Sequence, residues 1–103
     1  MATSKSYLDF ITDCLRYLSD VTFRPMMGEY LLYYGGKLVG GIYDDRLLVK
    51  PTLSAKKILK NAPLALPYEG AKEMLLVEDV EDEALLRLLF DALYADLPAP
   101  KRK

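Results

Sequence analysis

Residues 23–50, FRPMMGEYLLYYGGKLVGGIYDDRLLVK, decide the fold of this chain. Two runs rich in tyrosine, leucine and valine flank Gly35-Gly36, a pair that can adopt the positive φ required by a two-residue hairpin turn. A second pair of runs flanks Asp44-Asp45, which is a weaker form of the same signal. The stretch therefore predicts an antiparallel meander of three short strands joined by two tight turns. Within it, Gly40-Gly41 indicates a β-bulge or a close approach of another backbone.

Side-chain alternation sorts the predicted meander into two faces. If Gly35-Gly36 occupies the centre of its turn, Tyr34 lies opposite Lys37. One face is apolar and is expected to pack on the core; it carries Leu31, Tyr33, Leu38, Gly40, Ile42, Leu47 and Val49. The other face is mixed, with three tyrosines and three cations; it carries Tyr30, Leu32, Tyr34, Lys37, Val39, Gly41, Tyr43, Arg46, Leu48 and Lys50.

Helical patterns flank the meander on both sides. Residues 4–19 repeat apolar side chains every three or four positions, which predicts an amphipathic helix capped by Thr3 or Ser4. Residues 81–96 repeat this pattern behind a run of acidic side chains, which favours a helix N-terminus. Between the meander and the last helix we expect a short helix from Thr52 or Ser54 to Lys60, a loop over residues 62–70 and a fourth strand over residues 72–77.

These elements predict an α+β fold in a single domain that spans residues 1–103. The expected architecture has two layers, an antiparallel β-meander sheet and helices packed on one of its faces. Residues 98–103 contain two prolines and three cations and are expected to form a flexible tail. A chain of 103 residues, of which 51% are hydrophobic, can bury such a core without disulfides or metals.

The composition limits the chemistry that this chain can perform. It has no histidine, which removes the commonest general base and the commonest transition-metal ligand. Its single cysteine, Cys14, lies on the apolar stripe of the first helix, which favours a small buried hydrophobe over a nucleophile, and an unpaired cysteine suits the reducing cytoplasm. The acidic run over residues 78–83 lacks the spacing of a calcium loop. We therefore expect no metal, no cofactor, no enzymatic activity and no membrane anchor.

The mixed face of the meander is the candidate interaction surface. So much apolar and aromatic surface on an open face favours a protein interface, and a homodimer in particular. A half-solvated face without a partner is the plainer alternative. The candidate residues are Tyr30, Leu32, Tyr34, Lys37, Val39, Tyr43, Arg46, Leu48 and Lys50, and Leu88 and Tyr94 of the last helix are candidate extensions.

Single-stranded nucleic acid is another alternative occupant of that face. Tyrosine rings can stack on bases, while lysine and arginine neutralise phosphates. The residues suited to this role are Tyr30, Tyr34, Tyr43, Lys37, Arg46 and Lys50. The formal net charge of −1 argues against a dedicated binder of the phosphate backbone.

The amino-acid sequence of residues 24–50 resembles that of the N-terminal domain of the TfoX/Sxy family. Members typically show an Arg-x-Met-Phe-Gly segment, a tyrosine-rich hairpin ending in Gly-Lys, and an Asp-Arg-Leu turn followed by lysine. The matching positions are Arg24, Met26, Gly28, Gly36, Lys37, Asp45, Arg46, Leu47 and Lys50. The resemblance implies a small bacterial α+β domain without a catalytic motif, associated with competence genes and acting with other transcription factors. We expect Arg24 to form a salt bridge or present a recognition charge, and Met26 and Met27 to fill gaps in the core.

Overall fold

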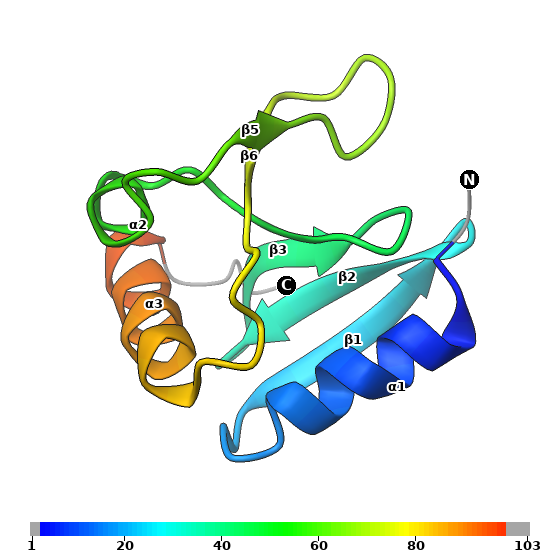
Figure 1. Ribbon diagram of the computed structural model, residues 1–103, viewed down its shortest axis with the longest axis horizontal. Helices are drawn as coiled ribbons and strands as arrows, with labels where there is room; N and C mark the ends of the chain where they lie inside the picture. The colour runs from blue at the N-terminus through cyan, green and yellow to red at the C-terminus, as the bar shows by residue number, and fades with distance from the viewer. Residues whose placement is uncertain (1–2, 99–103) are drawn as a thin grey trace.

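The computed structural model describes residues 3–98 and has an α+β fold (Figure 1). Six strands form one open antiparallel sheet in the order β1-β2-β3-β4-β6-β5. The strands are β1 (Val21–Met26), β2 (Glu29–Tyr34), β3 (Lys37–Ile42), β4 (Leu47–Val49), β5 (Leu64–Ala65) and β6 (Met74–Leu76). The helices are α1 (Lys5–Cys14), α2 (Leu53–Ile58) and α3 (Glu83–Asp96). The predicted fold class is confirmed, with two strands, β1 and β5, that the sequence did not indicate as separate elements. The predicted tail over residues 98–103 lies almost entirely outside the described residues.

Each helix begins at a residue whose side chain accepts an N–H group of the first turn, which satisfies a backbone donor that has no partner within the helix. Ser4, Thr52 and Asp82 are these N-caps. The helix α1 is shorter than the 4–19 prediction and ends at Cys14. The apolar stripe nevertheless continues, because Leu15 and Leu18 lie in the following turns and bury their side chains.

Three consecutive hairpins with two-residue turns build the strands β1–β4. Both central residues of each turn have positive φ: 52° and 87° at Met27-Gly28, 59° and 83° at Gly35-Gly36, and 52° and 56° at Asp44-Asp45. Such turns match the right-handed twist of the strands they join. The second and third turns confirm the prediction, whereas the first was missed because methionine carries no turn signal. Met27 is 97% exposed at the tip of this hairpin, so the prediction that it fills the core is wrong.

A β-bulge exchanges the two predicted faces in the hairpin of β2 and β3. Tyr33 pairs with Leu38, but Leu32 pairs with Gly40, so Val39 is an extra residue between these two pairs. Because side chains alternate with a period of two, one extra residue turns the strand over. The sheet face toward the helices, here called the inner face, therefore combines residues predicted for both faces: Tyr30, Leu32, Tyr34, Val39, Ile42, Leu47 and Val49.

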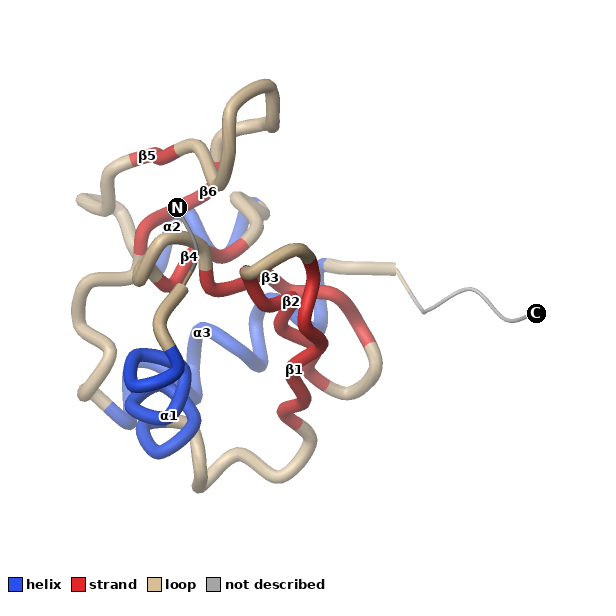
Figure 2. The backbone as a smooth tube through the Cα atoms, turned by 90° about the vertical axis from the view of Figure 1, so that its right-hand side faces the viewer, coloured by secondary structure: helices blue, strands red, loops and turns tan. Residues whose placement is uncertain are grey.

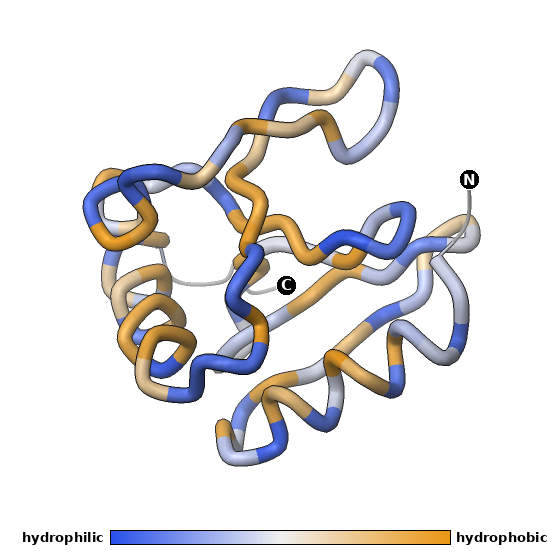
Figure 3. Tube along the Cα trace, in the orientation of Figure 1, coloured by the Kyte–Doolittle hydropathy of each residue, from blue (hydrophilic) through white to orange (hydrophobic). Residues whose placement is uncertain are grey.

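The main core lies between the inner face and the helices. Figure 2 shows α1 and α3 on the same side of β1, β2 and β3, and Figure 3 shows apolar residues recurring along both helices. Ile11 of α1 and Leu89, Phe90 and Leu93 of α3 are fully buried in one cluster with the inner-face side chains. No helix within residues 3–98 is long and apolar enough to cross a membrane.

The opposite side of the sheet, here called the outer face, carries Leu31, Tyr33, Leu38, Tyr43, Leu48 and Lys50. The prediction that Leu31, Tyr33 and Leu38 pack in the core is wrong, since the bulge turns them outward and each keeps part of its surface exposed. Tyr43 and Leu48 are buried, although they do not belong to the main core. The segment of residues 66–73 covers this end of the outer face and brings the buried Pro67 with it.

Candidate interaction groove

The nine residues predicted to share one interaction face do not lie on one surface. The bulge turns the hairpin of β2 and β3 over, so Tyr30, Leu32, Tyr34 and Val39 lie on the inner face and Lys37 reaches α3 on the same side. Tyr43, Leu48 and Lys50 lie on the outer face. Leu32, Val39 and Leu48 have no exposed surface at all. These three side chains stabilise the two sides of the sheet and are not available to a partner. The prediction of one continuous mixed face is therefore wrong.

The side chain of Lys37 forms hydrogen bonds with the C-terminal end of α3. Its Nζ donates to the carbonyl oxygens of Tyr94 and Leu97, at 2.7 and 2.9 Å, and lies 3.8 Å from the centroid of the Tyr94 ring. The last turn of α3 has no basic residue of its own, so this lysine supplies the cation that a helix C-terminus favours.

The side chain of Tyr34, on the same hairpin, also contacts α3. Its hydroxyl donates to Asp91 Oδ1 at 3.0 Å, and its ring packs edge-on against Phe90 at 5.5 Å. Burial and then the hydrogen bond to Asp91 raise the pKa of the Tyr34 phenol. The hairpin tip and helix therefore form one structural unit.

Arg46 ties the third hairpin to the segment that follows β5. Its Nε donates to the Tyr43 carbonyl at 3.1 Å, and one terminal nitrogen donates to the Leu66 carbonyl at 3.0 Å. Since the planar guanidinium spans both acceptors, it fixes the 66–73 segment over the outer face. Of the three predicted cations, Lys50 is the one whose side chain forms no ion pair or hydrogen bond within residues 3–98.

Tyr43 forms the floor of the site on the outer face. Its ring lies over Gly41, where an added Cβ would come within 2.6 Å of the ring. The ring of Tyr68 lies 6.0 Å away, centroid to centroid. Burial raises the pKa of the Tyr43 phenol further above physiological pH, so the buried ring carries no charge. Glycine at position 41 thus allows a buried aromatic floor close to the backbone of β3.

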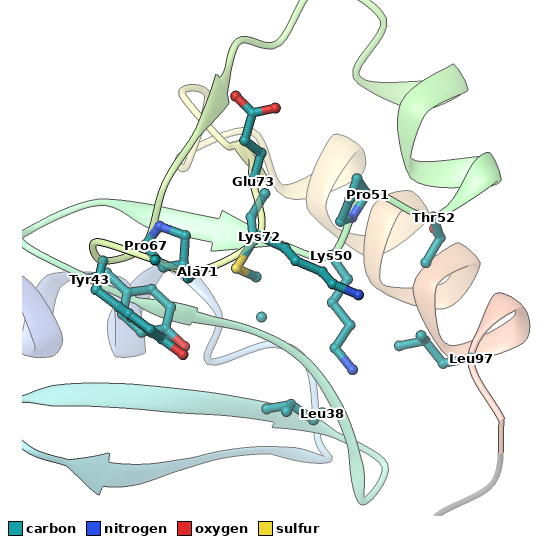
Figure 4. A pocket seen from close by; sticks show the side chains of 14 residues that line it. Leu38, Tyr43, Lys50, Pro51, Thr52, Pro67, Ala71, Lys72, Glu73 and Leu97 are labelled. Carbon is teal, nitrogen blue, oxygen red and sulfur yellow. The ribbon is translucent and has the colours of Figure 1, made fainter.

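A groove of about 750 Å³ opens beside this floor (Figure 4). Its walls come from β3, the segment that joins β4 to α2, the segment before β6 and the residue after α3; the lining residues are Leu38, Gly40, Tyr43, Lys50, Pro51, Thr52, Pro67, Tyr68, Gly70, Ala71, Lys72, Glu73, Met74 and Leu97. Lys50 and Lys72 both point into the groove, while the carboxylate of Glu73 points away from them (Figure 4). Within residues 3–98 the ion pairs are Lys5–Asp9 and Arg16–Asp13, so neither groove lysine is neutralised by a neighbour. The site therefore combines an apolar floor with two unpaired cations.

An exposed apolar segment borders the groove. Leu64, Leu66 and Tyr68 keep 50, 47 and 56% of their surface exposed. A second hollow, of about 410 Å³, shares Pro67 and Tyr68 with the groove and is otherwise lined mainly by charged side chains. Large apolar side chains this close together on a surface are typical of a contact site for another molecule.

Asp45 and Glu29 hold the start of α1 in place. Asp45 Oδ1 accepts hydrogen bonds from Ser4 N and Oγ at 2.8 and 3.2 Å. Glu29 Oε1 accepts from Thr3 N, Thr3 Oγ1 and Asp44 N, at 3.0, 2.7 and 3.0 Å. These bonds, here called the N-terminal latch, join the beginning of the described chain to two hairpin turns. The acidic side chains at this end of the sheet therefore have a structural role.

The remaining candidate residues are placed as follows. Gly28 and Gly36 supply positive φ in their turns, and Met26 is half-buried. Arg24 is exposed and forms no ion pair within residues 3–98, so the predicted structural salt bridge is wrong. Leu88 is 58% exposed on α3, away from the groove, whereas Tyr94 lies beneath Lys37.

Cys14 is only half-buried, and desolvation raises the pKa of its thiol. A thiol with a raised pKa is a poor nucleophile because less thiolate is present at neutral pH. Within the part of the chain that the structure describes, no group of three or more cysteine, aspartate or glutamate side chains lies in a metal-binding arrangement.

Residues 13–92 match the family model described as the TfoX N-terminal domain. The chain belongs to the TfoX N-terminal domain family. The resemblance found in the sequence is thereby confirmed, and it places the chain in a family of regulatory domains without a catalytic motif. The chain is also 39% identical over 102 residues to an uncharacterized 12.7 kDa protein in the trpE 5′ region of Spirochaeta aurantia, covering 98% of this chain and 89% of that protein. No solved structure matches.

The sequence did not reveal the groove of this TfoX N-terminal domain. One wall is formed by the segment from Pro67 to Met74, of which residues 67–70 were expected to be a plain loop and Lys72 was expected to begin a strand. One signal was available: Leu64 and Leu66 alternate between Pro63 and Pro67, and Tyr68 follows directly, which is unusual for a solvated loop. The position of that segment against the outer face depends on Arg46 and Pro67, and no sequence pattern indicates such a long-range contact.

Proposed function

We propose that this chain is a non-enzymatic, cytoplasmic regulatory domain that acts by binding another protein, as an accessory factor in bacterial competence or transcription. One observation carries the proposal: the groove on the outer face, with its apolar floor and unpaired lysines, continues into the exposed apolar segment of residues 64–68. Membership of the TfoX N-terminal domain family supports a regulatory role. The homodimer expected from the sequence stays a prediction, which light scattering over a dilution series measures.

Nucleic-acid binding through the predicted tyrosine and cation face has less support. Lys37 and Arg46 are engaged by backbone carbonyls, and Tyr34 faces α3. The hollow beside the groove is lined by Glu29, Asp44 and Glu69, which would repel a phosphate backbone, alongside Arg46, which is already committed. Single-stranded DNA is therefore the competing outcome in the experiments below.

Photo-crosslinking in a bacterium that carries the gene tests the proposal. We would place p-benzoylphenylalanine at Tyr68, which borders the groove, and at Leu88 as a matched control, since Leu88 is 58% exposed on α3 and lies away from the groove. We expect a discrete protein adduct from position 68 and none from position 88. A bulky Ala71→Trp substitution in the groove wall should abolish that adduct.

Regulation is measured in the same strains by transcript levels. Deletion of the gene should change a set of transcripts, which the wild-type chain restores and the Ala71→Trp variant does not. Equal adducts from both positions, or full rescue by Ala71→Trp with normal folding, would contradict the proposal. An adduct that is sensitive to nuclease would move the proposal to nucleic acid.

A further inference from the structure

The two lysines of the groove are the strongest unexplained feature of the outer face. Lys50 follows β4 directly, and its backbone N–H donates to the Val39 carbonyl at 2.8 Å, so the base of its side chain is fixed. Lys72 comes from the opposite wall, and the two side chains extend into the same space (Figure 4). Two cations that converge without a carboxylate between them favour an anionic ligand.

The apolar floor of the groove indicates that the anionic group of the ligand is attached to apolar groups. Leu38, Tyr43 and Met74 line the floor between the two lysine-bearing walls. A bare inorganic anion would leave these side chains exposed to water, whereas an anion attached to an apolar group would cover them. The ligand therefore carries a negative group with apolar side chains next to it.

We propose that the groove binds an extended acidic segment of a protein partner, in which carboxylates between the two lysines are flanked by apolar side chains on the floor. This inference rests on the proposed function and specifies the chemistry of the partner. The apolar surface continues past the groove to Leu64 and Leu66, which a small carboxylic acid in the groove would not reach. In such a segment the carboxylates can be confined to the stretch between the two lysines, whereas every nucleotide carries a phosphate, which the acidic hollow nearby would repel.

Fluorescence anisotropy with defined probes tests the inference. The probe is a fluorescein-labelled octapeptide of alternating aspartate and leucine, and the control probe replaces each aspartate with lysine. We expect saturable binding of the acidic peptide, weakening as salt increases, and no binding of the basic one. In the double variant Lys50→Glu, Lys72→Glu the affinity should fall by about tenfold or more. The matched control is Lys56→Glu, Lys57→Glu on α2, which keeps the same net charge outside the groove and should bind as the wild type does.

The other outcomes each overturn the inference in a recognisable way. No binding of the acidic peptide, or equal losses in the two double variants, removes the groove as an acidic-peptide site. Binding of decanoate alone, with the same dependence on Lys50 and Lys72, would assign the site to a small carboxylic acid. Binding of a twelve-residue oligothymidylate in place of the peptide would assign it to nucleic acid. Circular dichroism confirms that each variant is folded. If the crosslink at Tyr68 persists in the Lys50→Glu, Lys72→Glu variant, the proposed protein-binding function stands and only the acidic chemistry of the partner is wrong.

Discussion

Replacing Lys37 with methionine should destabilise the fold, because it removes the cation that, within residues 3–98, bonds to the end of α3, while keeping an apolar stem. The lost contacts are the two bonds to the Tyr94 and Leu97 carbonyls and the contact with the Tyr94 ring. A hydrogen bond to a charged group contributes about 1.5–3 kcal/mol, and a cation over an exposed ring about 0.5–1 kcal/mol. One bond is exposed and the other half-buried, so water replaces part of the loss. We therefore expect a decrease of about 2 kcal/mol in the free energy of unfolding, which lowers Tm by roughly 10 °C in a domain of this size.

Urea unfolding followed by circular dichroism at pH 7 measures this decrease directly. The m-value should stay constant, since the variant changes no core packing. Lys56→Met is the matched control; that side chain is exposed on α2 and forms no bond within residues 3–98, so its effect should stay within about 0.5 kcal/mol. Lys37→Arg should retain part of the stability, because it keeps the charge at the helix end. A Lys37→Met effect no larger than that of Lys56→Met would refute the assignment of Lys37 as the cap of α3.

Three further predictions concern the hairpin tip, the start of α2 and the outer face. Met27→Asn should raise the free energy of unfolding by about 1 kcal/mol, because Met27 has φ of 52° and asparagine tolerates that conformation better; an unchanged urea midpoint would contradict this. Asp96 accepts hydrogen bonds from Ser54 N and Oγ, which lower its pKa below 3.8, so its contribution to stability is complete above that pH and disappears as the pH falls through the lowered pKa. The stability difference between wild type and Asp96→Asn, measured by urea unfolding, should therefore shrink as the pH falls from 7 to below 3, and a constant difference would count against the linkage. Arg24→Ala should change stability by less than about 0.5 kcal/mol, since Arg24 has no ion pair within residues 3–98, and a loss above 1 kcal/mol would restore the structural salt bridge.

The sequence predicted local structure well and the arrangement of faces poorly, for a physical reason. Turn chemistry and helix caps are local properties, so the turns at Gly35-Gly36 and Asp44-Asp45 and the cap at Thr52 could be predicted from neighbouring residues. The bulge at Val39 depends on how two strands pair, and one extra residue is enough to exchange the faces. The groove needs still longer contacts, such as Arg46 to the Leu66 carbonyl, which no periodicity reveals.

The residues that match the TfoX/Sxy sequence motifs fall into two groups according to the contacts that they make in the structure. Most of them build the scaffold: Gly28 and Gly36 form turns, Lys37 caps α3, Asp45 holds the N-terminal latch, Arg46 fixes the 66–73 segment and Leu47 fills the core. Arg24 and Lys50 are the cations of this set whose side chains make no ion pair or hydrogen bond within residues 3–98. Strand pairing and alternation place both on the outer face of the sheet, opposite the helices. The fold uses neither cation, and the proposed function assigns both to the surface on which a partner would bind. Under that proposal the outer face, and not the helix-covered inner face, is the recognition surface of the domain.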